Sequence, residues 1–316
     1  MLKYYDYKRL IFRFFTGVFF LSGFFGNTCQ VYSDSRSAEL VPNGYVKDFL
    51  KGYSKEETDL IFEDSKNIKS LCFRNIISAK GQPVYVATAG GPGASKSTIL
   101  ETYLQDKPNY AYVDPDQRAL RYMINTYLQE FTNYKTSKTP DPKKCLQDSY
   151  NKWRGASNFI ASSLLNEAFS KGYNIAHGTT STSPHVTGLY KNLKDKSYKI
   201  ILLLSYSTDE NRVNALTHRA EKQNFCQVDP DDIVKKGKMF PERFKDYFQY
   251  ADEIHFYWTE KFDKGSIYAA SLVKGAPIKI YDAAAMEKFK QQYEHDRKAL
   301  NREEILPLEK LIKEFK

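Results

Sequence analysis

Short apolar stretches alternate along the chain with longer segments in which apolar residues recur every three or four positions. The strand-like stretches are PVYVATAG (83–90), YAYVD (110–114), NIAH (174–177), YKIILLLSY (198–206) and EIHFYWT (253–259). Helical patterns separate them, and the longest covers 150–171. Strands that alternate with helices of this length indicate an α/β fold with a parallel sheet and helices on both of its faces.

The same spacing predicts the remaining helices. They fall at 46–79, 98–105, 120–131, 209–224 and 241–250, and two charged amphipathic helices end the chain. In the 120–131 helix one face carries Leu120, Met123, Ile124, Tyr127, Leu128 and Phe131. Ser54 and Glu57 form a capping box ahead of Leu60. We therefore divide the chain into a helical preface (39–80) and a main domain with a C-terminal helical extension (81–316), with polar loops near Pro140 and at 224–240.

The first 38 residues differ from the rest. Four basic residues precede the apolar run FFTGVFFLSGFF (14–25), and small and polar residues follow it to Ala38. This is the order of a secretory signal peptide, so we expect residues 1–38 to be a targeting segment and the protein to be exported or secreted. The run is too short to span a bilayer comfortably, and no stable membrane span is expected. The alternative is an amphipathic helix or an uncleaved anchor on an otherwise cytoplasmic protein.

Composition narrows the class of ligand. The chain of 316 residues is 41% hydrophobic with a net charge of +9, which is typical of a folded globular protein. Its Lys and Arg are scattered, without a basic stripe interleaved with aromatic residues, so no nucleic acid is expected. The charge suits phosphorylated or acidic small molecules. Four widely separated cysteines indicate neither a zinc site nor a disulfide framework.

The strand-to-helix stretch VYVATAGGPGASKSTIL (84–100) is close to a P-loop, G-x-x-x-x-G-K-[ST]. Such a loop points backbone N–H groups at phosphates, a Lys reaches the β and γ phosphates, and a hydroxyl binds Mg²⁺. The predicted nucleotide-binding residues are Gly91, Gly93, Ala94, Ser95, Lys96, Ser97 and Thr98, with Ser97 as the metal ligand. Ser95 stands where the motif has its last glycine; a positive φ there would cost about 1–2 kcal/mol. The alternative is a glycine-rich turn without a ligand.

Two carboxylates follow the second predicted strand, in VDPDQ (113–117). Ligands of open α/β sheets lie beyond the carboxyl ends of the strands, where Asp114 and Asp116 are expected. A carboxylate there can accept the proton of an attacking hydroxyl or hold a metal through water. The alternative is a helix N-cap, and one aspartate can cap while the other catalyses.

The ordered set of motifs resembles the zeta-toxin family of small-molecule kinases over about 83–258. The set comprises GGPGASKST, VDPDQ, LLNEAFSKGYNIAHGTTSTS (164–183), and a strand followed by a helix with Arg212 and Arg219. The resemblance implies a P-loop NTPase-like fold, ATP and Mg²⁺ as cofactors, and transfer of the γ-phosphate of ATP to a hydroxyl of a nucleotide sugar such as UDP-N-acetylglucosamine. It also implies a protein partner, either an antitoxin or a host protein.

The resemblance assigns roles by position. Lys96 and Ser97 would serve ATP and magnesium, and Asp116 would be the general base, with Asp114 beside it in the substrate site. Thr179 matches a substrate-contacting threonine. Arg219 matches an arginine that reaches the transferring phosphate, and Arg212 is a second substrate-binding candidate that could equally be a solvated helix residue.

Several positions depart from the family pattern. His177 stands where the family has an acidic residue, and WRGASNF (153–159) holds no acid at the start of the long helix. The segment 224–240, which resembles the family's lid, offers Gln227, Lys235 and Lys236 where an arginine is usual. Two hypotheses follow: an active kinase, or a nucleotide-binding effector of the same fold that has lost phosphoryl transfer.

Overall fold

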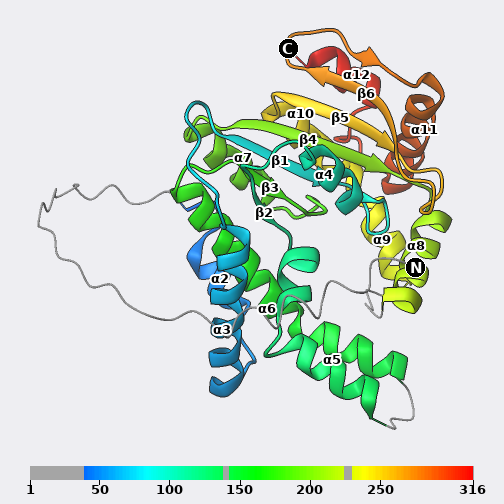
Figure 1. Ribbon diagram of the computed structural model, residues 1–316. Helices are drawn as coiled ribbons and strands as arrows, with labels where there is room; N and C mark the ends of the chain where they lie inside the picture. Colours follow the sequence, from blue (N-terminus) through cyan, green and yellow to red (C-terminus); the bar gives the residue numbers. More distant parts are fainter. Residues whose placement is uncertain (1–38, 138–141, 224–229, 316) are drawn as a thin grey trace, which may run out of the picture. The chain divides into compact units, whose positions relative to one another are not determined.

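In the computed structural model, which describes residues 39–137, 142–223 and 230–315, seven strands form one sheet in the order β2-β3-β1-β4-β5-β6-β7 (Figure 1). The strands are β1 Val84–Ala89, β2 Ala111–Val113, β3 Ile175–His177, β4 Lys199–Tyr206, β5 Glu253–Trp258, β6 Ile267–Val273 and β7 Lys279–Ile280. Strands β2 to β5 in this order pair in parallel, which confirms the predicted fold class. The unpredicted β6 adds an antiparallel edge with β7 and makes the sheet mixed.

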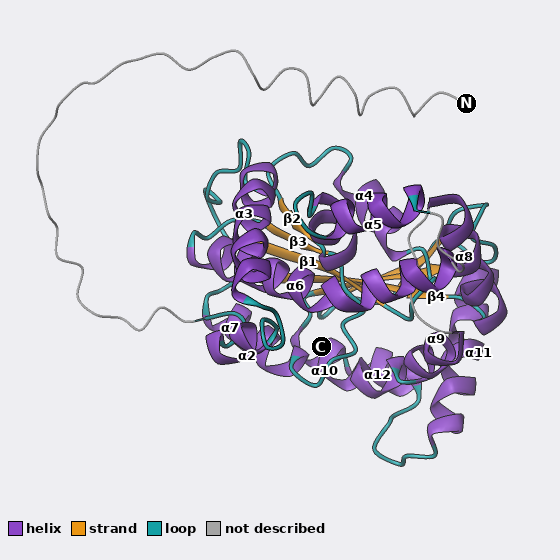
Figure 2. Ribbon diagram, turned by 90° about the horizontal axis from the view of Figure 1, so that it is seen from below, coloured by secondary structure: helices purple, strands orange, loops and turns teal. Residues whose placement is uncertain are grey.

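Helices cover both faces of the sheet (Figure 2). Helix α4 (Lys96–Leu104) packs on one face, where Val86, Ile201 and Leu203 lie in a small core cluster. Helices α7 (Val186–Asp195), α10 (Phe244–Tyr250) and α11 (Ala283–Leu300) lie on the other, with the alternate residues of β1 and β4 in the main core. Every residue of β4 after Lys199 is therefore buried, as expected for a strand with helices on both sides.

The long helix and several later helices agree only in part with prediction. Helix α6 (Pro142–Ser170) begins earlier than expected, α8 (Asp209–Gln223) agrees, and α12 (Leu308–Glu314) is the last helix. Helices α7 and α9 (Pro230–Lys238) were not predicted; α9 replaces part of the loop at 224–240. The predicted targeting segment (1–38) and the loop at Pro140 lie outside the described residues. Across the described parts of the chain, no helix has both the length and the apolar character needed to cross a membrane.

The predicted helix at 120–131 is wrong in its first half. A π-helical turn (Pro115–Ala119) and a 3₁₀ turn (Leu120–Tyr122) come first, and α5 spans Tyr127–Thr136. The interruption lies where Asn125 and Thr126 hydrogen-bond to Asp64. Ile124, which the pattern placed on the apolar face, is 55% exposed. A tertiary contact has overridden the helical periodicity.

The preface consists of α2 (Asn43–Asp48) and α3 (Lys55–Cys72), both packed against α6. The predicted capping box is confirmed, because the Ser54 side chain accepts from the Glu57 N–H and the Glu57 carboxylate accepts from the Ser54 N–H. Asp64 in the middle of α3 is fully buried. Its carboxylate accepts from Asn125 N at 3.0 Å, Asn125 Nδ2 at 3.0 Å and Thr126 Oγ1 at 2.7 Å. This aspartate joins the preface to the main domain.

Replacing Asp64 with Ala should destabilise the protein by about 3 kcal/mol, because buried donors on Asn125 and Thr126 lose their acceptor. Such a loss corresponds to a fall of roughly 5–10 °C in the thermal midpoint. Thermal unfolding followed by circular dichroism measures it, with the exposed Asp59→Ala on the same helix as the matched control. Equal midpoints for the two variants would contradict the anchoring role of Asp64.

Candidate active site

The loop between β1 and α4 is closely packed against its neighbours. Gly90 has φ +147° and Gly93 has φ +81°, which favour glycine. A Cβ at Gly90 would collide with the Ser205 carbonyl oxygen, and one at Gly93 would lie 2.5 Å from the Arg212 carbonyl oxygen. Ser205 Oγ donates to the Ala94 carbonyl at 2.6 Å. The loop therefore has one well-determined course from the strand into α4.

Ser95 adopts the left-handed conformation that the motif normally gives to glycine. Its φ is 56° and its ψ is 19°, immediately before the first residue of α4. The backbone thus follows the course that the sequence comparison with a P-loop requires, with a serine at the strained position. The serine in place of glycine therefore adds backbone strain at position 95 but does not change the path of the loop.

The variant Ser95→Gly should raise stability by about 1 kcal/mol, because glycine adopts a positive φ without the Cβ clash. A gain of this size raises the thermal midpoint by roughly 2–4 °C. Differential scanning calorimetry measures the shift, and ATP titration checks that the loop still binds nucleotide. The matched control is Ser97→Gly at the second residue of α4, where glycine should destabilise. A lower midpoint for Ser95→Gly would contradict the strain.

Lys96 lies at the start of α4, and its ammonium donates to the Gly91 carbonyl at 2.7 Å. Burial, together with the nearby charges of Arg219 and Arg212, lowers the pKa of Lys96 to about 7 against the opposing effect of Asp114 and Asp116. A phosphate bound among these cations would favour the charged lysine. The loop thus presents Lys96 to the cleft as a group that a bound phosphate would keep charged.

The two aspartates after β2 have different environments. Asp114 is 5% exposed, and its Oδ1 accepts from Asp116 N and Gln117 N, both at 2.8 Å. Burial, followed by the charge of Asp116, raises the pKa of Asp114 to about 6. Its other oxygen packs against Gly178, where any Cβ would collide with it. Asp114 therefore has the capping role, although both aspartates line the cleft.

Asp116 forms an ion pair with Arg154 of α6, through Oδ1 and Nη1. The Asp116 side chain is 19% exposed and that of Arg154 is 32% exposed. Arg154 was missed by sequence reasoning, which searched WRGASNF for an acid. The signal available in the sequence was the positive charge of Arg154, because an arginine on a neighbouring helix can pair with a predicted catalytic carboxylate.

The end of β3 supplies His177 and Thr179. His177 Nδ1 lies 2.7 Å from the Tyr85 hydroxyl, and burial lowers the pKa of His177 to about 4, so the ring is neutral near pH 7. Thr179 N donates to Thr88 Oγ1 at 3.0 Å, and Thr179 Oγ1 accepts from Ser181 N at 3.1 Å. Both residues are held by the neighbouring strand β1 and face the same cleft.

The two arginines of α8 are placed differently. Arg219 lines the cleft. Arg212 is 3% exposed and does not line it; its guanidinium donates to the Ile233 carbonyl at 2.8 Å and pairs with Asp209. A Cβ at Gly91 would lie 2.6 Å from Arg212 Nη1, and one at Gly237 of α9 would collide with the same guanidinium. Arg212 thus clamps α9 to the P-loop, and its predicted contact with substrate stays a prediction.

A cleft of about 770 Å³ brings most of the predicted residues together. Its lining includes Gly93, Ser95, Lys96, Ser97, Asp114, Asp116, Arg154, His177, Thr179, Arg219 and Lys236. Gly91, Ala94, Thr98 and Lys235 do not line it, and Gln227 lies outside the described residues. Its far wall is formed by Leu40, Tyr45 and Phe49 from the preface. Volumes of this size are typical of small-molecule sites.

The donors around Ser97 suit magnesium. Ser97, Asp114 and Asp116 contribute hydroxyl and carboxylate oxygens to one cleft. No group of three or more His, Cys, Asp or Glu side chains able to hold a metal occurs among the residues that the structure describes. Mg²⁺ is usually held by one or two protein oxygens together with substrate phosphates, so it requires no such cluster.

Comparison with known proteins decides the family. Residues 71–246, more than half of the chain, match the zeta toxin family. The chain belongs to the zeta toxin family. This zeta-toxin match confirms the resemblance given by the loop, the VDPDQ motif and the end of the long helix, and it covers most of the region expected to resemble the family. No curated protein matches the sequence at a significant level.

Solved structures agree in fold. The first is from the study of the PezAT chromosomal toxin-antitoxin system of Streptococcus pneumoniae: 18% identity, TM-score 0.52, covering 81% of this chain and 99% of that one. The AvrRxo1-ORF1:-ORF2 complex with ATP has 13% identity and TM-score 0.54, covering 78% and 77%. The same complex with sulphate ions has 14% identity and TM-score 0.53, covering 78% and 75%. Membership of the zeta toxin family identifies the chain as an ATP-dependent kinase, a phosphotransferase.

Proposed function

We propose that the chain transfers the γ-phosphoryl group of ATP to a hydroxyl of a nucleotide sugar such as UDP-N-acetylglucosamine. The observation that carries the proposal is the placement of Lys96, Asp116 and Arg219 in the lining of one cleft. Those are a phosphate-binding lysine, a carboxylate able to accept a proton, and a planar cation suited to equatorial phosphoryl oxygens. Thr179 and His177 lie in the same lining and would contact the acceptor.

The reaction requires one proton acceptor and stabilisation of negative charge. The acceptor hydroxyl oxygen forms a bond to the γ-phosphorus while the bond from that phosphorus to the β,γ-bridging oxygen breaks, and ADP leaves. The hydroxyl proton passes to the Asp116 carboxylate. Lys96 and Arg219 face the phosphates and stabilise the transferring group. Ser97 would hold Mg²⁺, which supplies further charge neutralisation on the phosphates.

His177 gives the acceptor side a neutral group where the family pattern has an acid. Burial lowers the pKa of His177 to about 4, so its ring carries no charge near pH 7 and contacts its neighbours through hydrogen bonds. Its bond with Tyr85 leaves the second ring nitrogen to contact ligand. A phosphoryl acceptor with a hydroxyl or carbonyl group could form a hydrogen bond with this nitrogen.

The direct test is to incubate the full chain with ATP, Mg²⁺ and single acceptors, and to follow ADP release. The panel should contain UDP-N-acetylglucosamine, other nucleotide sugars and the corresponding free sugars. Mass spectrometry of the product should find one added phosphoryl group on the nucleotide sugar. ADP release that does not depend on any acceptor would overturn the proposal.

The second candidate is a nucleotide-binding effector without phosphoryl transfer. The observation that favours it is the neutral His177 in the cleft, at the position where the family pattern has an acidic residue. Calorimetry distinguishes the two functions, since this candidate requires ATP binding without ADP release across the acceptor panel.

We also infer a protein partner, either an antitoxin or a host protein. It is supported by the toxin-antitoxin system and the ORF1:ORF2 complex described for two structures of the same fold. Expression of the chain alone and together with the product of its neighbouring gene tests the antitoxin. Growth arrest that the second protein does not relieve would count against it.

The export of the protein remains our proposal, based on the basic start and apolar run at 14–25. Cell fractionation of the full chain and mass spectrometry of its mature N-terminus test it. An intact Met1 on cytosolic protein would overturn it.

A further inference from the structure

The segment 40–53 precedes the part of the chain that matches the zeta toxin family, which begins at residue 71. It nevertheless contributes Leu40, Tyr45 and Phe49 to the wall of the cleft that also holds Lys96 and Asp116. The zeta-toxin motifs alone therefore do not complete this cleft, and residues outside them bear on its chemistry.

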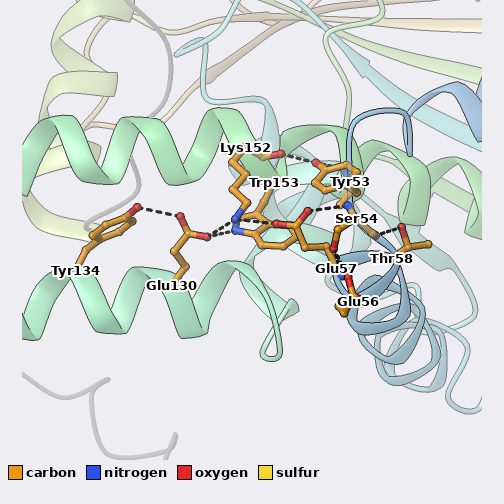
Figure 3. A network of polar contacts seen from close by, with 10 residues as sticks. Tyr53, Ser54, Glu56, Glu57, Thr58, Glu130, Tyr134, Lys152 and Trp153 are labelled. Atoms are coloured by element: carbon orange, nitrogen blue, oxygen red, sulfur yellow. Dashed lines mark hydrogen bonds and ion pairs between the residues drawn. The ribbon is translucent and has the colours of Figure 1, made fainter.

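At the end of this segment the Tyr53 side chain lies against helix α6 (Figure 3). Its hydroxyl donates to the Lys152 carbonyl and accepts from the Ala156 N–H at 3.1 Å. These groups are the acceptor and the donor of one i to i−4 step of the helix, so the hydroxyl contacts both ends of that step. Gly155 allows the approach, because a Cβ there would lie 2.9 Å from the Phe49 carbonyl oxygen and 3.1 Å from Tyr53 Oη.

The outer side of the same turn is held by a polar network (Figure 3). Lys152 pairs with Glu57 of α3 at 3.0 Å and with Glu130 of α5 at 3.4 Å. Trp153 Nε1 donates to Glu130 at 2.7 Å, and its ring stacks on Tyr53 with centroids 5.5 Å apart and planes at 14°. The turn at 152–156 is thus held by α3, by α5 and by the loop between α2 and α3 that carries Tyr53.

The residue in the middle of this turn is Arg154. Its Nη1 pairs with Asp116 Oδ1 and lies 3.4 Å from Ser157 Oγ. Tyr53 and Asp116 therefore contact the same helical turn from different elements, and a change in the course of that turn moves the guanidinium relative to the carboxylate.

We propose that Tyr53 is a positioning residue for Asp116 that acts through Arg154. The hydroxyl sets the course of the 152–156 turn, the turn sets the place of the guanidinium, and the guanidinium holds the carboxylate toward the acceptor hydroxyl. The kinetic part of this inference rests on the proposed kinase function. The physical coupling between Tyr53 and Asp116 does not.

The kinetic test is a double-mutant cycle with Tyr53→Phe and Arg154→Ala in the full chain. Tyr53→Phe keeps the ring on Trp153 and removes only the hydroxyl; it should lower kcat about tenfold or more, since small misplacements of catalytic groups have effects of this order. The KM for ATP should stay unchanged. In the Arg154→Ala background the same change should lower kcat less than about twofold. If the fold loss in kcat of the double variant equals the product of the two single losses, Arg154 does not carry the effect of Tyr53.

A second cycle needs no substrate and combines Tyr53→Phe with Asp116→Asn in thermal unfolding. The midpoint of the double variant should fall by at least about 2 °C less than the sum of the two single falls, because contacts in one network are not additive. Additive shifts would overturn the coupling. The matched control is Tyr281→Phe, an exposed tyrosine directly after β7, paired with Asp116→Asn; those two changes should add. Failure of the wild type to phosphorylate any acceptor would instead overturn the proposed function, and the thermal cycle would still decide the coupling.

Discussion

Replacing Asp116 with Asn should lower kcat for phosphoryl transfer by about 10²–10⁴-fold, because the amide cannot accept the proton of the attacking hydroxyl. ATP should bind with little change, since the expected phosphate ligands are the P-loop, Lys96 and Arg219, which line the cleft. Coupled measurement of ADP release gives kcat, and calorimetry gives the ATP affinity of the same protein. The combination separates loss of the base from loss of the nucleotide site.

Two controls make the Asp116 result specific. Asp106→Asn removes an exposed carboxylate just beyond the end of α4 and should leave kcat unchanged. Thermal unfolding of Asp116→Asn checks folding, because this variant leaves Arg154 without its counter-charge. A folded Asp116→Asn protein with wild-type kcat would exclude Asp116 as the base.

The strands and the loop were predictable because local sequence determines them. The β4 stretch has five consecutive apolar residues, and the glycines at 90 and 93 are required by backbone conformations and close contacts that other residues do not tolerate. Asp114 and Asp116 follow a strand directly, so the parallel topology alone carries them to the carboxyl edge of the sheet. These parts of the site depend on short-range pattern and on one topological rule.

The parts that prediction missed depend on contacts between distant segments. The break before α5 arises where Asn125 and Thr126 bind Asp64, about sixty residues earlier in the chain. The role of Arg212 beneath the P-loop requires two glycines, at 91 and 237, that are far apart in sequence. Arg154 faces Asp116 only because α6 crosses the end of β2. The local pattern of apolar and polar residues gives no indication of these long-range contacts.

Replacing Lys96 with Met should weaken ATP binding about 100-fold, which corresponds to roughly 3 kcal/mol for removal of a buried charge partner of the phosphates. The wild type should also lose affinity as pH rises. In the free protein the pKa of Lys96 is lowered to about 7, chiefly by burial, whereas bound phosphate favours the charged form and raises that pKa. Below pH 7 the lysine is already charged, so affinity is greatest there.

Above pH 7 ATP must bind with uptake of a proton, and the affinity should fall by an amount that approaches tenfold per pH unit. Calorimetric titration between pH 7 and pH 9, in buffers of different ionisation enthalpy, measures both the affinity and the proton uptake. In Lys96→Met the slope and the uptake should disappear, while the exposed Lys310→Met on α12 should keep both. If the ATP affinity of Lys96→Met falls with pH as steeply as that of the wild type, a group other than Lys96 titrates. Loss of the slope would establish that the serine-containing loop uses its buried lysine to bind phosphate.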